Sequence, residues 1–206
     1  MKKRVDEMNY EEKEQLLKRI VKDLKEILSE NRYLHCISTM KKASQMAKEY
    51  NEDEQIVMLT AVAHDIAKEM TNEELIEYAT KNNVKLNEVD KMATMVLHGK
   101  IGADIVEKKY GFTKEMKDAI YYHSTGRANM TVLDKIIFLA DKSEDRRIGE
   151  DADKLRKLIQ QEGLDKAILW DIDYYTIPRT IEKTKVIHTE CINTRNDIIM
   201  KLNVQK

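Results

Sequence analysis

The sequence contains few of the residues that interrupt helices. Among its 206 residues there are one proline and six glycines, and aromatic residues make up 6% of the chain. Lysine, glutamate, isoleucine, leucine, methionine and alanine are abundant, and most of them have a high helix propensity. This shortage of helix breakers predicts helix over nearly the whole chain, and therefore an all-α fold.

Cysteine and long apolar runs are scarce as well. Cys36 and Cys191 form neither a CxxC pair nor a disulfide framework, and the beginning MKKRVDEMNYEEKEQ lacks the apolar core of a signal peptide. No apolar run approaches the ~20 residues that span a bilayer, so we expect no transmembrane helix and a cytoplasmic location. The net charge of -1 gives no general attraction for a polyanion, which argues against broad nucleic-acid binding. Any phosphate ligand therefore needs a local site.

Apolar periodicity and capping residues divide the chain into successive helices, without repeats or linkers. Asn51 or Asp53 can cap a helix that is expected to reach about Lys68, and Thr71 with Glu74 forms a capping box that opens the next one. Other helices are predicted over residues 10–28, 32–50, 89–110 with a break near Gly99, 113–123 and 130–144.

The region from Asp151 onward is expected to carry two more helices. Pro178 predicts a kink or a break there, and residues 183–186 predict a turn. The aromatic residues of this region could stack on a base, but packing in the core is the favoured interpretation. These residues are Trp170, Tyr174 and Tyr175.

The segment AVAHDIAKEM places His64, Asp65 and Lys68 among small and apolar residues. In a helix, Lys68 follows the other two at spacings of four and three, so that all three side chains edge one face. Buried charge is unfavourable unless it is paired or bound to a metal. An ion pair between Asp65 and Lys68 beside a core histidine is the simpler alternative, and this segment alone does not decide between the two.

The other histidines favour a metal site. His35, His98 and His123 lie on predicted helices or at their ends, with apolar neighbours, and Asp141 follows the apolar run IIFLA. Each of these histidines alone is more often a core residue. Imidazole nitrogens together with carboxylate oxygens suit iron, zinc or manganese, whereas magnesium is usually bound by carboxylates and water. Binding of a metal at one site would account for all of these residues together with the adjacent pair of His64 and Asp65.

The order of these residues resembles the HD-domain superfamily of metal-dependent phosphohydrolases, from about Arg32 to Arg147. The segments RYLH, AHDIAK, LHGKIGA, YHSTG, LDKIIFLADK and VIHTECINTRND are similar to the YqeK family of symmetrical diadenosine tetraphosphate hydrolases. The resemblance implies an all-α helical bundle of the HD type, with the metal site among its core helices. It also implies a single domain over residues 1–206, with a packing helix over 1–30, a metal-binding core over 31–147 and C-terminal helices over 148–206 that complete a nucleotide pocket.

The resemblance further implies roles for individual residues. The implied metal set comprises His35, His64, Asp65, His98, His123 and Asp141. Within it His98 and His123 match positions that face a second metal ion or the substrate phosphates, and Asp65 would bridge two ions. Asp65 and Lys68 would carry the catalysis. The implied substrate-binding residues are Arg32, Lys68, His98, His123, Arg147, His188 and Arg195.

The implied reaction is the hydrolysis of diadenosine tetraphosphate to two ADP molecules by a metal-bound hydroxide. One or two iron ions are expected, with zinc or manganese as alternatives. The expected partners are the dinucleoside polyphosphate and ADP, without nucleic acid or membrane, and a homodimer stays open. Two other functions also stay open. One is an HD-type phosphohydrolase acting on a nucleoside monophosphate or a signalling nucleotide, and the other is a non-catalytic nucleotide or metal sensor.

Overall fold

The computed structural model describes residues 3–204 as helices joined by short connections. No strand occurs among these residues, so the all-α prediction is confirmed. The elements in chain order are a 3₁₀-helix (Val5–Glu7), α1 (Tyr10–Ile27), α2 (Glu30–Glu49), α3 (Glu54–Ala63), α4 (Asn72–Lys81), α5 (Glu88–Met92), α6 (Thr94–Tyr110), α7 (Lys114–Tyr121), α8 (Val132–Ser143), α9 (Glu150–Glu162), α10 (Leu164–Trp170), a π-helix (Asp171–Thr176), α11 (Ile177–Glu182) and α12 (Thr189–Val204). No helix in this part of the chain is long and apolar enough to cross a membrane.

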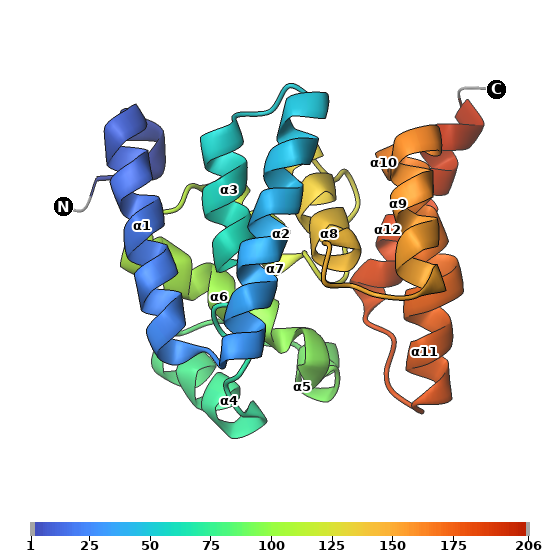
Figure 1. Cartoon of the computed structure of the whole chain (residues 1–206). Coiled ribbons are helices and arrows are strands. Elements are labelled where there is room, and N and C mark those ends of the chain that lie inside the picture. The colour runs from blue at the N-terminus through green and yellow to red at the C-terminus, as the bar shows by residue number, and fades with distance from the viewer. Residues whose placement is uncertain (1–2, 205–206) are drawn as a thin grey trace.

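Helix α8 lies between the N-terminal and the C-terminal helices (Figure 1). It packs against α2 and α3 on one side and against α9 and α10 on the other, while α1 packs on α3. The main buried cluster includes Leu24 of α1, Ile137 of α8, Ile168 of α10 and Ile198 of α12. Residues from the ranges 1–30, 31–147 and 148–206 therefore share one core, and a smaller cluster holds α4 against α6.

The third helix begins where the sequence predicts but ends early. The side chain of Asp53 caps it, whereas α3 ends at Ala63 and the chain continues to Met70 in tight turns, so the prediction of helix to about Lys68 is wrong. The turns show in the hydrogen bond from the Lys68 amide to the Asp65 carbonyl, 2.9 Å long. Nδ1 of His64 bonds the Ala61 carbonyl at 2.7 Å. In a continued helix the Asp65 amide would donate to that carbonyl, whereas here the His64 imidazole bonds it.

Two other predicted features are wrong. The long helix expected over 89–110 is interrupted at Ala93, between α5 and α6, and not near Gly99. Beyond Asp151, the described residues form four α-helices and a π-helix in place of two helices. The π-helix lies directly before the turn that holds Pro178, whose missing N–H removes a regular helical hydrogen bond. The expected disturbance at Pro178 is thus a change of helix type, and residues 183–186 lie in a non-helical connection as predicted.

Gly99 lies where α6 passes close to the backbone at the end of α7. A Cβ atom at this position would lie 2.9 Å from the Tyr121 carbonyl oxygen and 3.2 Å from Nδ1 of His123. A backbone carbonyl at that distance leaves no room for a side chain, which only glycine avoids. Gly99 therefore allows α6 to bring His98 next to His123.

Candidate metal centre

Four histidines and two aspartates meet at the centre of the bundle. Nε2 of His35 lies 3.1 Å from Oδ1 of Asp141, and Nε2 of His98 lies 3.1 Å from Oδ1 of Asp65. Donor atoms lie within 4.8 Å of one another in two groups that share His64. The groups are His35, His64 and Asp141, and His64, Asp65 and His123. The six residues that the sequence singles out for metal binding are thus brought together from α2, α6, α8 and the turns after α3 and α7.

All four histidines are oriented through Nδ1. In three of them, Nδ1 bonds the backbone carbonyl of the third residue before it: His64 to Ala61 at 2.7 Å, His98 to Met95 at 2.9 Å, and His123 to Ile120 at 2.7 Å. Nδ1 of His35 lies 3.0 Å from Oε1 of Glu144. Carbonyl and carboxylate oxygens only accept hydrogen bonds, so in each neutral imidazole Nδ1 carries the proton. Each Nε2 then presents a lone pair to the cluster.

The centre of the cluster contains polar atoms that lack partners. Nε2 of His35, Nε2 of His64 and Oδ1 of Asp65 are buried without a hydrogen bond. Nε2 of His98 lies 3.1 Å from Nε2 of His123, where two lone pairs would repel one another. Buried acceptors in this number need a compensating cation. The donor set of nitrogen and oxygen atoms therefore fits a divalent transition metal.

The charges of the cluster agree with this interpretation. Burial lowers the pKa of His98 to about 4 and also lowers that of His123, so both imidazoles are neutral at pH 7. Burial raises the pKa of Asp65, but His64, His123 and His98 outweigh it and hold that pKa well below the ordinary value. Burial likewise lowers the pKa of His64, but Asp65 and Asp141 raise it more, so a cation and a proton compete for this imidazole.

Three basic side chains flank the cluster. Nη1 of Arg32 lies 2.8 Å from Oδ2 of Asp65, and Nη2 of Arg147 lies 2.9 Å from Oδ1 of Asp141. Nζ of Lys68 lies 3.2 Å from Nε2 of His98. Lys68 stands in a turn, so the helical-face argument for it is wrong. The turn nevertheless brings its ammonium group to the cluster.

Sequence reasoning assigned no role to the groups that support the cluster from behind. Glu144 is buried at the end of α8 and orients His35, and its position shortly after Asp141 was the available signal. Arg156 of α9 donates hydrogen bonds to three backbone carbonyls of the segment that holds Glu144, with lengths of 2.9, 2.8 and 2.6 Å. These carbonyls belong to Ser143, Glu144 and Arg147. Nothing in the spacing of α9 indicated this contact.

The cluster opens into a cleft of about 1040 Å³, which is at the upper end of ordinary ligand sites. Lys68, Ser124 and Asp141 line it at the cluster. Residues 92–96 at the junction of α5 and α6 line one part, and residues 183–188 line another. The cleft is rich in cations, namely Lys68, Lys142, Arg146, Arg147, Arg179, Lys183 and Lys185. Anionic ligands are therefore favoured there.

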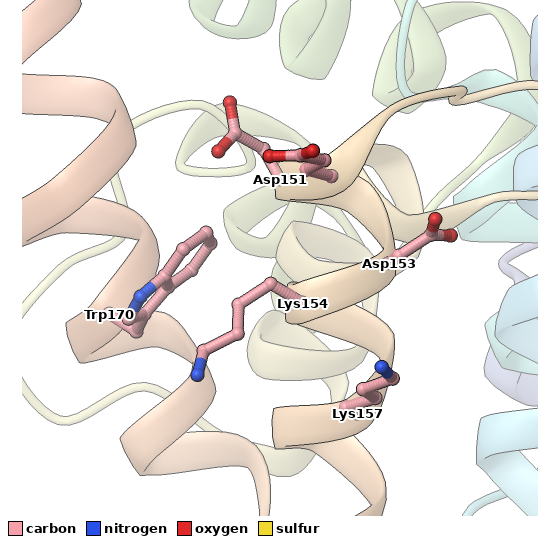
Figure 2. Close-up of a pocket in the computed structure, with 6 residues that line it drawn as sticks. Asp151, Asp153, Lys154, Lys157 and Trp170 are labelled. Carbon is pink, nitrogen blue, oxygen red and sulfur yellow. The ribbon is translucent and has the colours of Figure 1, made fainter.

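Aromatic side chains from the C-terminal region reach this cleft. Trp170 packs partly on the core and lines both the cleft and a smaller pocket, where it faces Lys154 of α9 (Figure 2). Tyr175 lines the cleft, and the Arg179 guanidinium lies 4.1 Å from the centre of its ring. Tyr174 is 72% exposed. The expectation of core packing is therefore wrong for Tyr174 and Tyr175.

The two residues expected on the nucleotide side differ in position. His188 lines the cleft, and its Nε2 lies 3.3 Å from Oδ1 of Asp90. Arg195 is not part of the cleft lining, and its guanidinium pairs with Asp173 of the π-helix. The structure therefore does not bring Arg195 together with the other site residues, and its contact with a nucleotide stays a prediction.

Comparison with known proteins agrees with this geometry. The family model of the HD domain matches residues 32–145, which include the whole cluster. The chain belongs to the HD-domain family. Two similar relatives are symmetrical bis(5'-nucleosyl)-tetraphosphatases. The protein from Halalkalibacterium halodurans is 34% identical over 177 residues, which cover 84% of this chain and 92% of the relative. The protein from Bacillus subtilis is 31% identical over 150 residues, which cover 72% and 80%.

A solved structure shares the fold of this HD-domain chain. It is the crystal structure of a predicted HD superfamily hydrolase involved in NAD metabolism from Clostridium acetobutylicum. The two proteins are 34% identical in sequence, with a TM-score of 0.85 over 89% of this chain and 97% of the other. The similarity thus extends well beyond the matched HD domain, into the C-terminal helices that line the cleft.

We expect Glu144→Gln to weaken binding of a divalent metal by about ten- to a hundredfold, because His35 loses the charged acceptor that orients it. Asp65→Ala should abolish binding. Calorimetric titration of chelator-treated protein with Mn²⁺ measures both effects. Asp153→Asn is the matched control, since it removes only the ion pair between Asp153 and Arg156 and leaves the carbonyl contacts of Arg156 intact. Wild-type affinity in Glu144→Gln would contradict the supporting role.

Proposed function

We propose that this HD-domain protein is a metal-dependent hydrolase that cleaves diadenosine tetraphosphate symmetrically into two ADP molecules. The observation that carries the proposal is the cluster of four oriented imidazoles and two carboxylates at one side of a cation-rich cleft. The similarity to symmetrical tetraphosphatases over most of the chain supports the choice of substrate. Iron is the proposed metal, with zinc or manganese as alternatives that the same donor atoms accept.

Different residues of the cluster are proposed to have different roles in the reaction. His35, His64, Asp65 and Asp141 would hold the cation, with His98 and His123 beside a second ion or the phosphates. When bound, such a cation supplies a hydroxide nucleophile from water near neutral pH and stabilises charge on the attacked phosphoryl group. Lys68 adds a fixed positive charge at the same point. Burial lowers its pKa, although Asp65 and Asp141 oppose this effect.

The cleft is proposed to set the position of cleavage. Symmetrical hydrolysis requires the central linkage of the tetraphosphate at the cluster, with one nucleoside diphosphate on each side. ADP is a good leaving group, so the reaction needs little general-acid assistance. Arg147 and His188 line the cleft and are proposed to contact the substrate, as are Arg32 beside Asp65 and Arg195 on the nucleotide side. The substrate is an intracellular nucleotide, which favours the cytoplasm, and the chain acts alone or as a homodimer.

Wild-type protein loaded with iron should convert diadenosine tetraphosphate to ADP alone. Chromatographic separation of the products measures this directly. AMP with ATP in equal amounts would indicate asymmetric cleavage. This result would contradict the proposal that the central linkage of the tetraphosphate lies at the cluster. Binding without turnover would indicate a sensor, and turnover of a nucleoside monophosphate or a signalling nucleotide instead would indicate another HD-type phosphohydrolase.

Lys68→Met should lower kcat by roughly ten- to a thousandfold, the scale expected when one preorganised charge is removed. Metal content should not change, because Lys68 contacts His98 through a single hydrogen bond and supplies no ligand atom. Steady-state kinetics and elemental analysis of the same sample separate the two effects. The control is Lys81→Met, which changes an exposed residue at the end of α4. Full activity in Lys68→Met would restrict Lys68 to a structural role.

A further inference from the structure

Lys142 holds its ammonium group at the boundary between the cluster and the cleft. It follows Asp141 in the last turn of α8, and Phe138 lies one helical turn before it. Nζ of Lys142 lies 4.0 Å from the centre of the Phe138 ring, and 14% of the Lys142 side chain is exposed. A cation over an aromatic ring is favourably placed and partly removed from water. Lys142 also lines the cleft.

The other cations beside the cluster are already engaged. Arg32 pairs with Asp65, Arg147 pairs with Asp141, and Lys68 contacts His98. In the described part of the chain, Lys142 makes no hydrogen bond, and one carboxylate oxygen, Oδ2 of Asp141, lies 4.0 Å from its Nζ. This distance is too long for a hydrogen bond. The three N–H donors of Lys142 are therefore available to a ligand.

Neither of the carboxyl groups near Lys142 provides full compensation. Asp141 is a proposed metal ligand, so a bound cation shares its charge. Asp171 is buried in the cleft lining and accepts a hydrogen bond from Thr176. Among the residues that the structure describes, Asp171 forms no salt bridge with Lys142, and Oδ2 of Asp141 at 4.0 Å is the carboxylate oxygen that lies near the Nζ of Lys142. The metal-loaded site thus leaves positive charge at Lys142 that an anion can neutralise.

Lys68 and Lys142 adjoin different halves of the cluster. Lys68 contacts His98, beside the group formed by His64, Asp65 and His123. Lys142 adjoins Asp141, which belongs to the group with His35 and His64. Both lysines line one cleft. A polyphosphate with its central linkage at the cluster extends in two directions, and the two lysines adjoin different halves of that cluster.

We propose that Lys142 binds a phosphate of the substrate that is not attacked, in the nucleoside diphosphate half opposite to the one beside Lys68. The inference rests on the proposed function and specifies which part of the substrate lies beside Lys142. The cluster alone recognises one phosphate, whereas the cluster with Lys142 recognises a diphosphate. Lys142 then selects polyphosphate substrates over simple phosphoesters.

The test compares Lys142→Met and Lys142→Arg with wild-type protein, all loaded with metal. Calorimetry measures the affinity for ADP and for inorganic phosphate, and kinetics measure KM and kcat with diadenosine tetraphosphate. Lys142→Met should weaken ADP binding and raise KM by about ten- to a hundredfold, the usual effect of losing a charged hydrogen bond. Phosphate affinity and metal content should not change, and Lys142→Arg should restore most of the ADP affinity. The control is Lys154→Met, in the smaller pocket of Figure 2.

Three results would overturn the proposal. Unchanged ADP affinity together with an unchanged KM for diadenosine tetraphosphate in Lys142→Met would show that no phosphate contacts this residue. Equal losses for ADP and phosphate, or loss of metal, would show that Lys142 serves the cluster itself. Loss of stability that Asp171→Asn repairs would show that Lys142 only neutralises Asp171. Failure of the proposed function is distinct: wild-type protein would then not cleave diadenosine tetraphosphate, while a selective loss of ADP affinity in Lys142→Met would still support the contact.

Discussion

The hydrogen bonds at Nδ1 of the four histidines are the constraint on which the centre of this protein depends. Three backbone carbonyls and Glu144 take the Nδ1 protons, so every Nε2 lone pair turns inward. Without a cation, Nε2 of His35, Nε2 of His64 and Oδ1 of Asp65 are buried without a hydrogen-bond partner. When a cation is bound, the same side chains form a preorganised binding site, because they need little rearrangement to contact it.

The packing of the helices positions the residues of the cluster by bringing backbone segments close together. Gly99 lets α6 approach the end of α7, and the early end of α3 turns Asp65 and Lys68 toward the cluster. Arg156 fastens the segment after α8 from the other side and so supports Glu144 behind His35. The C-terminal helices then add the cation-rich cleft, which turns a metal cluster into a site for a phosphorylated ligand.

Much of this could be predicted from the sequence because it depends on residue type and spacing. The shortage of helix breakers predicted the helices, the capping box at Thr71 is present, and the histidines and aspartates were recognised from their order. The end of α3 was not predictable from periodicity, since Ile66 and Ala67 continue the apolar pattern beyond the last helical residue. Arg156 and the outward turn of Tyr174 depend on contacts between distant segments, which local patterns do not report. Arg195 illustrates the same limit, because its pairing with Asp173 arises only when the π-helix and α12 meet.

The central claim is that imidazole nitrogens and carboxylate oxygens of this cluster bind a catalytic metal. X-ray absorption spectroscopy at the metal edge, on active protein purified without chelator, tests it most directly. The account predicts a first coordination sphere of nitrogen and oxygen with the outer-shell scattering of imidazole, and loss of this signal together with activity after chelation. Fully active protein without bound metal, or a spectrum dominated by sulfur ligands, would contradict the account.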